Sequence, residues 1–186
     1  MDESFMKFLN KAGKFSDKEA LLLQQEIQYR DLKKETYLLK EGDTCSSLYF
    51  VILGSFYQYK TDSDLNTNVI DLRITNDWII ENKSFTSRKP SEYTIKAFTD
   101  STVIELSIHS IHKLIAISPS FFQIGKVLEE ATARVAFFDN NNTPDEKYEY
   151  ILKNKPQLLQ EFPQKIIASY LKITPETLSR VRKRIQ

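Results

Sequence analysis

Residues 162–186 read FPQKIIASYLKITPETLSRVRKRIQ. This stretch predicts two short helices, the first over Pro163–Leu171, joined by a tight turn at Lys172. The second helix is expected to begin at Thr174, whose hydroxyl can cap it, with Pro175 in the first helical position. The residues spaced to pack the two helices together are apolar, with one small residue where the helices would meet: Ile167, Ala168, Leu171, Leu178 and Val181.

Two helices joined in this way form a helix-turn-helix, in which the second helix enters the major groove of DNA. The cations of that helix could neutralise phosphates or read guanine, which would explain Arg180, Arg182, Lys183 and Arg184. The alternative is an ordinary helical hairpin with a solvated basic face, because Lys172 stands where the motif usually has a glycine.

The composition of the 186 residues predicts a globular chain of one large or two small domains, 41% hydrophobic and with a net charge of +1. From Thr143 onward, nine Lys and Arg against five Asp and Glu give +4, so the first 142 residues carry −3. An acidic front and a basic end indicate two modules, the second able to meet a polyanion. The charged N-terminus does not resemble a signal peptide, no membrane span is expected, and a cytosolic location follows as the default.

Residues 33–107 change to the pattern of short strands, such as SLYFVILGSFYQYK and STVIELS. Turn residues separate these runs, among them Gly42 and Gly54. Several short strands at close spacing predict an antiparallel barrel or sandwich. A helical segment over residues 1–30 is expected to precede it, with a capping box formed by Ser16 and Glu19.

A long helix is expected next, starting near Ser118-Pro119. Apolar residues recur along it at spacings of three and four, which is typical of a heptad seam: Phe121, Ile124, Leu128, Ala131, Val135 and Phe138. The seam could pack only on the β-module. However, Phe122, Val127 and Phe137 add apolar surface on other sides, which favours a seam between two copies of the chain. A break at residues 140–142 then leads to Thr143 and Pro144, which begin an all-helical module.

The whole chain resembles the Crp/Fnr family of bacterial transcription regulators. The order of elements matches, LKEGDTCSSLYFVILGSFYQYK is similar to the family's β-roll signature, and IASYLKITPETLSRVRK looks like its recognition motif. The resemblance implies an α+β fold: a cyclic-nucleotide-binding-like jelly roll over residues 1–117, a dimerisation helix and hinge over 118–142, and a helix-turn-helix domain over 143–186. The family's β-hairpin wing does not follow within residues 1–186.

The resemblance also implies a homodimer that binds double-stranded DNA, with RNA polymerase as a further partner and no membrane contact. Glu176 and Arg180 fall at the family's base-reading positions, and Pro175 where a third contact is found. The expected DNA-binding set is Thr174, Pro175, Glu176, Thr177, Ser179, Arg180, Arg182, Lys183 and Arg184. The rival hypothesis is a small-molecule sensor whose helical end docks on a protein.

The family's cyclic AMP binders place a Glu on the ribose and an Arg on the cyclic phosphate. Here Glu81 aligns with that Glu, but Asn82 follows it, and Ser91 and Glu92 stand where Arg and Ser or Thr are required. A carboxylate repels a phosphate, so cyclic AMP is not expected to bind and no cofactor is predicted. Another effector, no effector, or a cavity filled by side chains all stay open. The nearby aromatic residues are expected to be core: Trp78, Phe85 and Tyr93.

Other chemistry finds little support. His109 and His112 could share a helix face, but two ligands without a third make a weak metal site. Cys45 is the only cysteine, which excludes an internal disulfide. No nucleophile–base pattern or glycine-rich phosphate loop occurs, so an enzyme is not expected.

Overall fold

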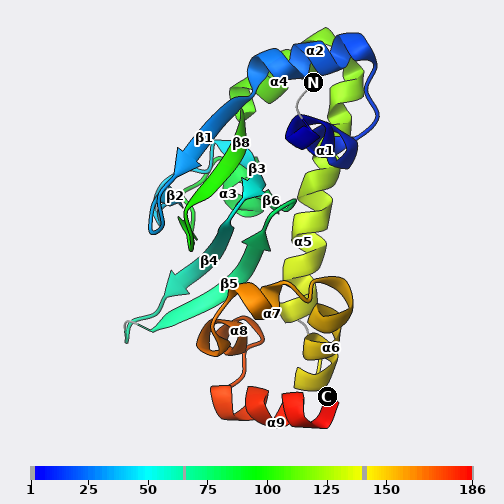
Figure 1. Cartoon of the computed structure of the whole chain (residues 1–186). Helices are drawn as coiled ribbons and strands as arrows, with labels where there is room; N and C mark the ends of the chain where they lie inside the picture. The colour runs from blue at the N-terminus through cyan, green and yellow to red at the C-terminus, as the bar shows by residue number, and fades with distance from the viewer. Residues whose placement is uncertain (1–2, 65, 140–141, 186) are drawn as a thin grey trace.

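The computed structural model describes residues 3–64, 66–139 and 142–185 (Figure 1). Two four-stranded antiparallel sheets form a β-roll, with strand orders β1-β8-β3-β6 and β2-β7-β4-β5. The predicted antiparallel β-module is therefore confirmed. Its strands are β1 (Gln28–Leu32), β2 (Tyr37–Leu39), β3 (Ser47–Leu53), β4 (Ser55–Thr61), β5 (Thr67–Ile74), β6 (Trp78–Ile79), β7 (Thr94–Ala97) and β8 (Ser101–Ser107).

Strand β1 begins earlier than the β-module was predicted to begin. Residues 28–32 pair with β8, although residues 1–30 were expected to be helical. The sequence QYRDL gives no apolar alternation, because β1 is an edge strand whose side chains are mostly exposed. Contacts with β8 hold the register of β1, and one of them is the Arg30–Glu105 ion pair at 2.8 Å.

The turn between β3 and β4 requires a glycine. Gly54 has a φ of +94°, and a Cβ there would lie 2.1 Å from the Ser101 hydroxyl oxygen. That position therefore tolerates no side chain, and the chain passes through it from β3 in the first sheet to β4 in the second.

Helices lie before, within and after the roll (Figure 1). The predicted Ser16–Glu19 capping box is present at the start of α2, and Ser118 caps the predicted long helix. That helix starts as a 3₁₀ turn, η1, before it becomes α-helical. The helices are α1 (Glu3–Ala12), α2 (Asp17–Glu26), α3 (Asn82–Ser87), α4 (Ile108–Ile117), η1 (Pro119–Gly125), α5 (Lys126–Asp139), α6 (Pro144–Asn154), α7 (Leu158–Glu161), α8 (Gln164–Tyr170) and α9 (Pro175–Ile185).

The break predicted at residues 140–142 lies partly outside the described residues, which omit 140 and 141. Thr143 caps α6 as predicted and forms a capping box with Glu146. None of the helices within the described ranges is long and apolar enough to cross a lipid bilayer.

Two apolar clusters hold the fold together. One fills the roll and extends to α1, α2, α4 and the first half of α5. The second joins the C-terminal helices to Phe138 at the end of α5 and to Val69 and Leu72 on β5. The Val69 N–H also donates to the Ser169 hydroxyl on α8 at 2.9 Å. The C-terminal helices therefore pack on the roll through β5.

The turn between α8 and α9 places Lys172 in the left-handed region, with a φ of +59°. A residue with a Cβ pays about 1–2 kcal/mol to adopt this conformation, whereas glycine adopts it readily. We expect Lys172→Gly to raise the free energy of unfolding by about 1 kcal/mol, measured by urea titration followed by circular dichroism.

The matched control is Lys183→Gly, which makes the same chemical change at an exposed position in the last turn of α9. There the backbone is helical, so glycine should lower the free energy of unfolding by about 1 kcal/mol. A loss of stability in both variants would show that the Lys172 side chain stabilises the turn more than its φ costs.

Candidate DNA-binding surface and effector pocket

Helix α9, which the sequence predicts to be the recognition helix, is anchored by apolar contacts. Leu178 and Val181 are buried against α6 and α8, together with Ile167 and Leu171 of the first helix of the motif. The Thr174 hydroxyl accepts a hydrogen bond from the Thr177 N–H at 3.2 Å, as predicted for a helix cap. Burial of one side of α9 in this way fixes which side is exposed.

The opposite side of α9 is exposed and polar. Glu176, Ser179, Arg180 and Lys183 lie three or four residues apart, which places them on one face. The Arg180 Nε lies 3.5 Å from the Glu176 carbonyl oxygen, so its guanidinium follows the helix surface. Hydrogen bonds from its own backbone N–H and from Thr174 lower the pKa of Glu176, which keeps this carboxylate charged. Thr174 and Pro175 are also exposed at the start of the helix.

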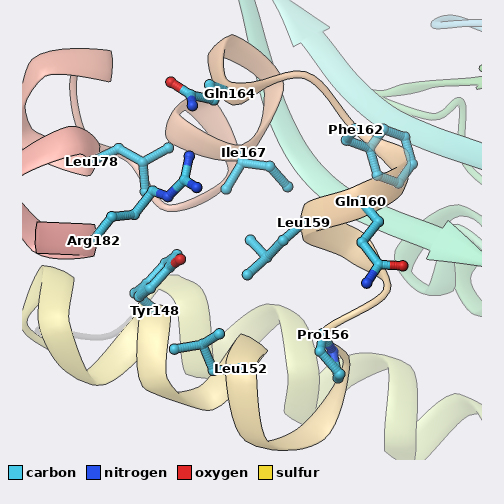
Figure 2. Close-up of a pocket in the computed structure, with 10 residues that line it drawn as sticks. All are labelled: Tyr148, Leu152, Pro156, Leu159, Gln160, Phe162, Gln164, Ile167, Leu178 and Arg182. Atoms are coloured by element: carbon cyan, nitrogen blue, oxygen red, sulfur yellow. The ribbon is translucent and has the colours of Figure 1, made fainter. Parts of the chain in front are cut away.

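Three of the predicted DNA-binding residues are placed differently. Arg182 is half-buried and lines a cavity inside the helical module (Figure 2). Arg184 forms an ion pair with Asp145 on α6. Thr177 is half-buried behind the exposed face. The sequence showed which residues are cationic but not which side of α9 packs inward.

A pocket of about 330 Å³ lies between the roll and α5, where the family's phosphate cassette aligns. Glu81 lines it but is 5% exposed, and its carboxylate accepts hydrogen bonds from the N–H groups of Lys83 at 3.1 Å and Ser84 at 2.6 Å. Glu81 is therefore the N-cap of α3. The apolar part of the pocket includes Ile70, Ile80, Ala131, Val135 and Ala136.

The two positions that replace the cassette's Arg and Ser or Thr have other partners. Ser91 is buried, and its hydroxyl donates to the Tyr93 carbonyl at 2.9 Å. Glu92 is exposed and forms ion pairs with Lys83 and, at 3.5 Å, with Lys60. Hydrogen bonding and attraction from Lys83 lower the pKa of Glu92, so it is ionised at neutral pH. Lys60 and Lys83, which lie beside the position of the cassette's Arg, are therefore already paired with the Glu92 carboxylate.

Asn82 connects the pocket to the long helix. Its amide nitrogen donates to the Thr132 hydroxyl on α5 at 2.5 Å. Its Oδ1 is buried without a hydrogen-bond partner among the described residues. Of the aromatic residues predicted to be core, Trp78 and Phe85 are buried, and Tyr93 is half-buried and lines the pocket.

The predicted dimer seam is largely buried within a single chain. Phe121, Ile124 and Ala131 belong to the roll core, and Phe138 belongs to the helical core. The seam prediction is wrong for these four residues, because the heptad spacing marks the face of the helix that packs on its own chain. Leu128 and Val135 are half-buried. Beside them, an exposed strip follows the outer face of η1 and α5: Phe122, Glu129, Thr132 and Ala136.

Buried charges at the junction of the roll and α5 were not found from the sequence. Asp71 on β5 pairs with Arg73 and lies 3.4 Å from the Arg134 Nε on α5. Nearby, Lys155 after α6 pairs with Asp77 at 2.5 Å. Opposite charges at Asp71 and Arg73, two residues apart on a strand, are the one signal that could have indicated a buried pair.

Cys45 and the two histidines do not form a site. Cys45 is 3% exposed, and burial raises the pKa of its thiol, so the reactive thiolate is disfavoured. Within the described ranges, no group of three or more His, Cys, Asp or Glu residues is placed to hold a metal ion.

Comparison with known proteins agrees with this geometry. Residues 29–118 match the family described as the cyclic nucleotide-binding domain. No curated protein matches the sequence. Among solved structures, FixK2 from Bradyrhizobium japonicum has a TM-score of 0.67 at 19% identity, covering 86% of this chain and 84% of that one. The c-di-GMP responsive regulator CLP from Xanthomonas campestris has a TM-score of 0.63 at 18% identity, covering 92% of both chains.

A third similar structure is a protein from Eubacterium rectale assigned to the Crp/Fnr family of transcriptional regulators. Its TM-score is 0.65 at 15% identity, covering 99% of this chain and 88% of that one. At these identities the likeness concerns the fold. Residues 29–118 are thus similar to the cyclic nucleotide-binding domain, and the chain shares its fold with the regulators from Xanthomonas campestris and Eubacterium rectale.

Proposed function

We propose that this protein is a homodimeric, DNA-binding transcription regulator whose effector pocket is not adapted to a cyclic nucleotide. The observation that carries the proposal is the exposed face of α9, where Glu176, Ser179, Arg180 and Lys183 project from a helix anchored on its other side. In a helix-turn-helix, these are the positions that meet base edges and the adjoining backbone. The protein would act in the cytoplasm, where it reaches DNA.

The domain division that supports this function is a roll over residues 1–117, a dimerisation helix over 118–142 and a DNA-binding module over 143–186. Since β5 of the roll contributes to the core of the helical module, the DNA-binding module would move relative to the roll only by changing that contact. In a dimer, two copies of α9 would face half-sites about 34 Å apart.

The dimer contact would use the exposed strip on η1 and α5, together with the half-buried Leu128 and Val135. These residues are mostly apolar or small, and Phe122 is 67% exposed in the single chain. A second copy would cover them and would also close the outer side of the effector pocket, which Thr132, Val135 and Ala136 line.

Removal of Arg180 and removal of Lys183 should affect DNA binding in different ways. Arg180 can grip guanine O6 and N7 bidentately, so Arg180→Ala should cost about 1–3 kcal/mol on the preferred site and relax base choice at one position. Lys183, one turn later, is placed for a phosphate, so Lys183→Ala should weaken all sequences alike and lower the salt slope by about one. The measurement is selection from random DNA, followed by titrations at several salt concentrations.

Equal weakening of specific and random DNA by both variants would make Arg180 another phosphate contact. Unchanged DNA binding in both variants would instead favour a protein partner for α9. Apolar docking on such a partner would depend weakly on salt, whereas counterion release makes DNA binding depend on it steeply.

The dimer contact can be tested without touching the core. Val135→Glu combined with Ala136→Glu places like charges on both sides of a two-fold contact, so light scattering should give a monomer with an intact circular dichroism spectrum. The matched control is Leu21→Glu with Leu53→Glu, at exposed leucines outside α5, which should stay dimeric. A folded double variant at residues 135 and 136 that is still a dimer would exclude this face.

Cyclic AMP should not bind with useful affinity. Glu92 presents a negative charge beside the place of the phosphate, and Ser91 offers no cation. Calorimetry with millimolar cyclic AMP should therefore show no saturable heat. Micromolar affinity would overturn this part of the proposal and indicate that Lys60 and Lys83 exchange Glu92 for the phosphate.

A further inference from the structure

A cavity of about 290 Å³ lies inside the helical module, away from the effector pocket. Figure 2 shows its walls, which come from α6, α7, α8, α9 and the segments that join them. Most lining side chains are apolar, and the floor is formed by buried residues, including Phe162, Ile167 and Leu178. A cavity of this size is at the lower limit for small-molecule sites, which are typically apolar with a few polar groups.

One polar group of the cavity is the hydroxyl of Tyr148 on α6. The Tyr148 side chain is only 1% exposed, and Figure 2 shows its hydroxyl pointing into the cavity. Within the described part of the chain this hydroxyl makes no hydrogen bond. The hydroxyl oxygen is not among the buried polar atoms that lack a partner, so it is open to the cavity, where it can donate to a ligand.

A second polar group is the guanidinium of Arg182 on α9, and the amides of Gln160 and Gln164 also line the cavity. It points from the recognition helix into the space between the helices (Figure 2). Arg184, one residue further on, pairs with Asp145, whereas Arg182 has no ion-pair partner among the described residues. No Asp or Glu lines the cavity. A mostly apolar cavity is thus lined by one half-buried cation, for which the described residues supply no ion-pair partner.

We propose that this cavity binds a small amphipathic carboxylate. The Arg182 guanidinium would hold the carboxylate through two parallel hydrogen bonds, and the Tyr148 hydroxyl would donate a third. The hydrocarbon part would lie against Leu152, Leu159 and Ile167. The apolar walls favour a carboxylate with a hydrocarbon chain over inorganic phosphate, because phosphate would leave these walls uncovered and lose its own hydration.

The site would also affect DNA binding by α9, the helix that carries Arg182. Because Arg182 lines the cavity and lies off the exposed face of α9, it would reach a DNA phosphate only by leaving the cavity. A bound carboxylate would prevent this movement, so ligand and DNA would weaken each other's binding. This consequence rests on the proposed function, whereas the binding site itself does not. The two are therefore measured separately.

The first experiment measures binding to the full chain without DNA, with octanoate as the probe and 1-octanol and phosphate as comparisons. Octanoate should bind saturably by calorimetry, and both 1-octanol and phosphate should bind at least about tenfold more weakly. Arg182→Gln should reduce octanoate affinity to that of 1-octanol. The matched control Lys183→Gln removes the neighbouring, exposed cation and should leave octanoate affinity unchanged.

A second variant fills the cavity instead of removing charge. Leu159→Trp on α7 should abolish octanoate binding while the melting temperature stays near that of the wild type. Absence of octanoate binding, equal affinities for octanoate and 1-octanol, or an unchanged affinity in Arg182→Gln would each overturn the site. If octanoate binds as expected, a DNA titration with and without octanoate tests the coupling. Unaltered DNA binding would then refute the coupling alone.

Discussion

The arrangement of the molecule depends most on the buried ion pairing of the Asp71 carboxylate with two arginines. It is 1% exposed on β5, pairs with Arg73 and lies 3.4 Å from the guanidinium Nε of Arg134 on α5. Burial alone would raise the pKa of Asp71, but the two guanidinium groups outweigh it and hold the pKa below its ordinary value. Removing one partner of such a pair leaves an uncompensated buried charge, which is strongly destabilising. The long helix is thereby fixed against the second sheet at its middle.

Two further polar contacts connect this ion pair to its surroundings, one toward the pocket and one toward the helical module. Arg73 also lines the candidate effector pocket and donates to the Trp78 carbonyl at 2.6 Å. On the other side, Asp77 holds Lys155 at the end of α6. Strand β5 and the turn that follows it therefore contact the pocket, the long helix α5 and the helical module. A change at the pocket that altered Arg73 would reach the helices through contacts only one or two residues apart.

Local rules explain what the sequence could predict. Thr174, Thr143 and Ser16 cap the helices they were expected to cap, because capping depends on residues within one turn. Prediction was poorer where the partner is distant in the chain. The heptad spacing on α5 found an apolar face but could not tell the chain's own roll from a second copy. The basic run on α9 gave its charge but not that Arg182 lies inward. Asp71 and Arg134 are too far apart in sequence for any pattern to pair them.

The hydrogen bond between the Val69 N–H and Ser169 has a consequence for aggregation. Strand β5 ends its sheet, paired on one side only with β4, and α8 covers its other side. An uncovered edge would present free N–H and C=O groups to strands of other molecules. Helix α8, which packs against α9, thus also protects the roll from intermolecular strand pairing. Mutations that loosen α8 would therefore threaten solubility as well as the proposed DNA binding.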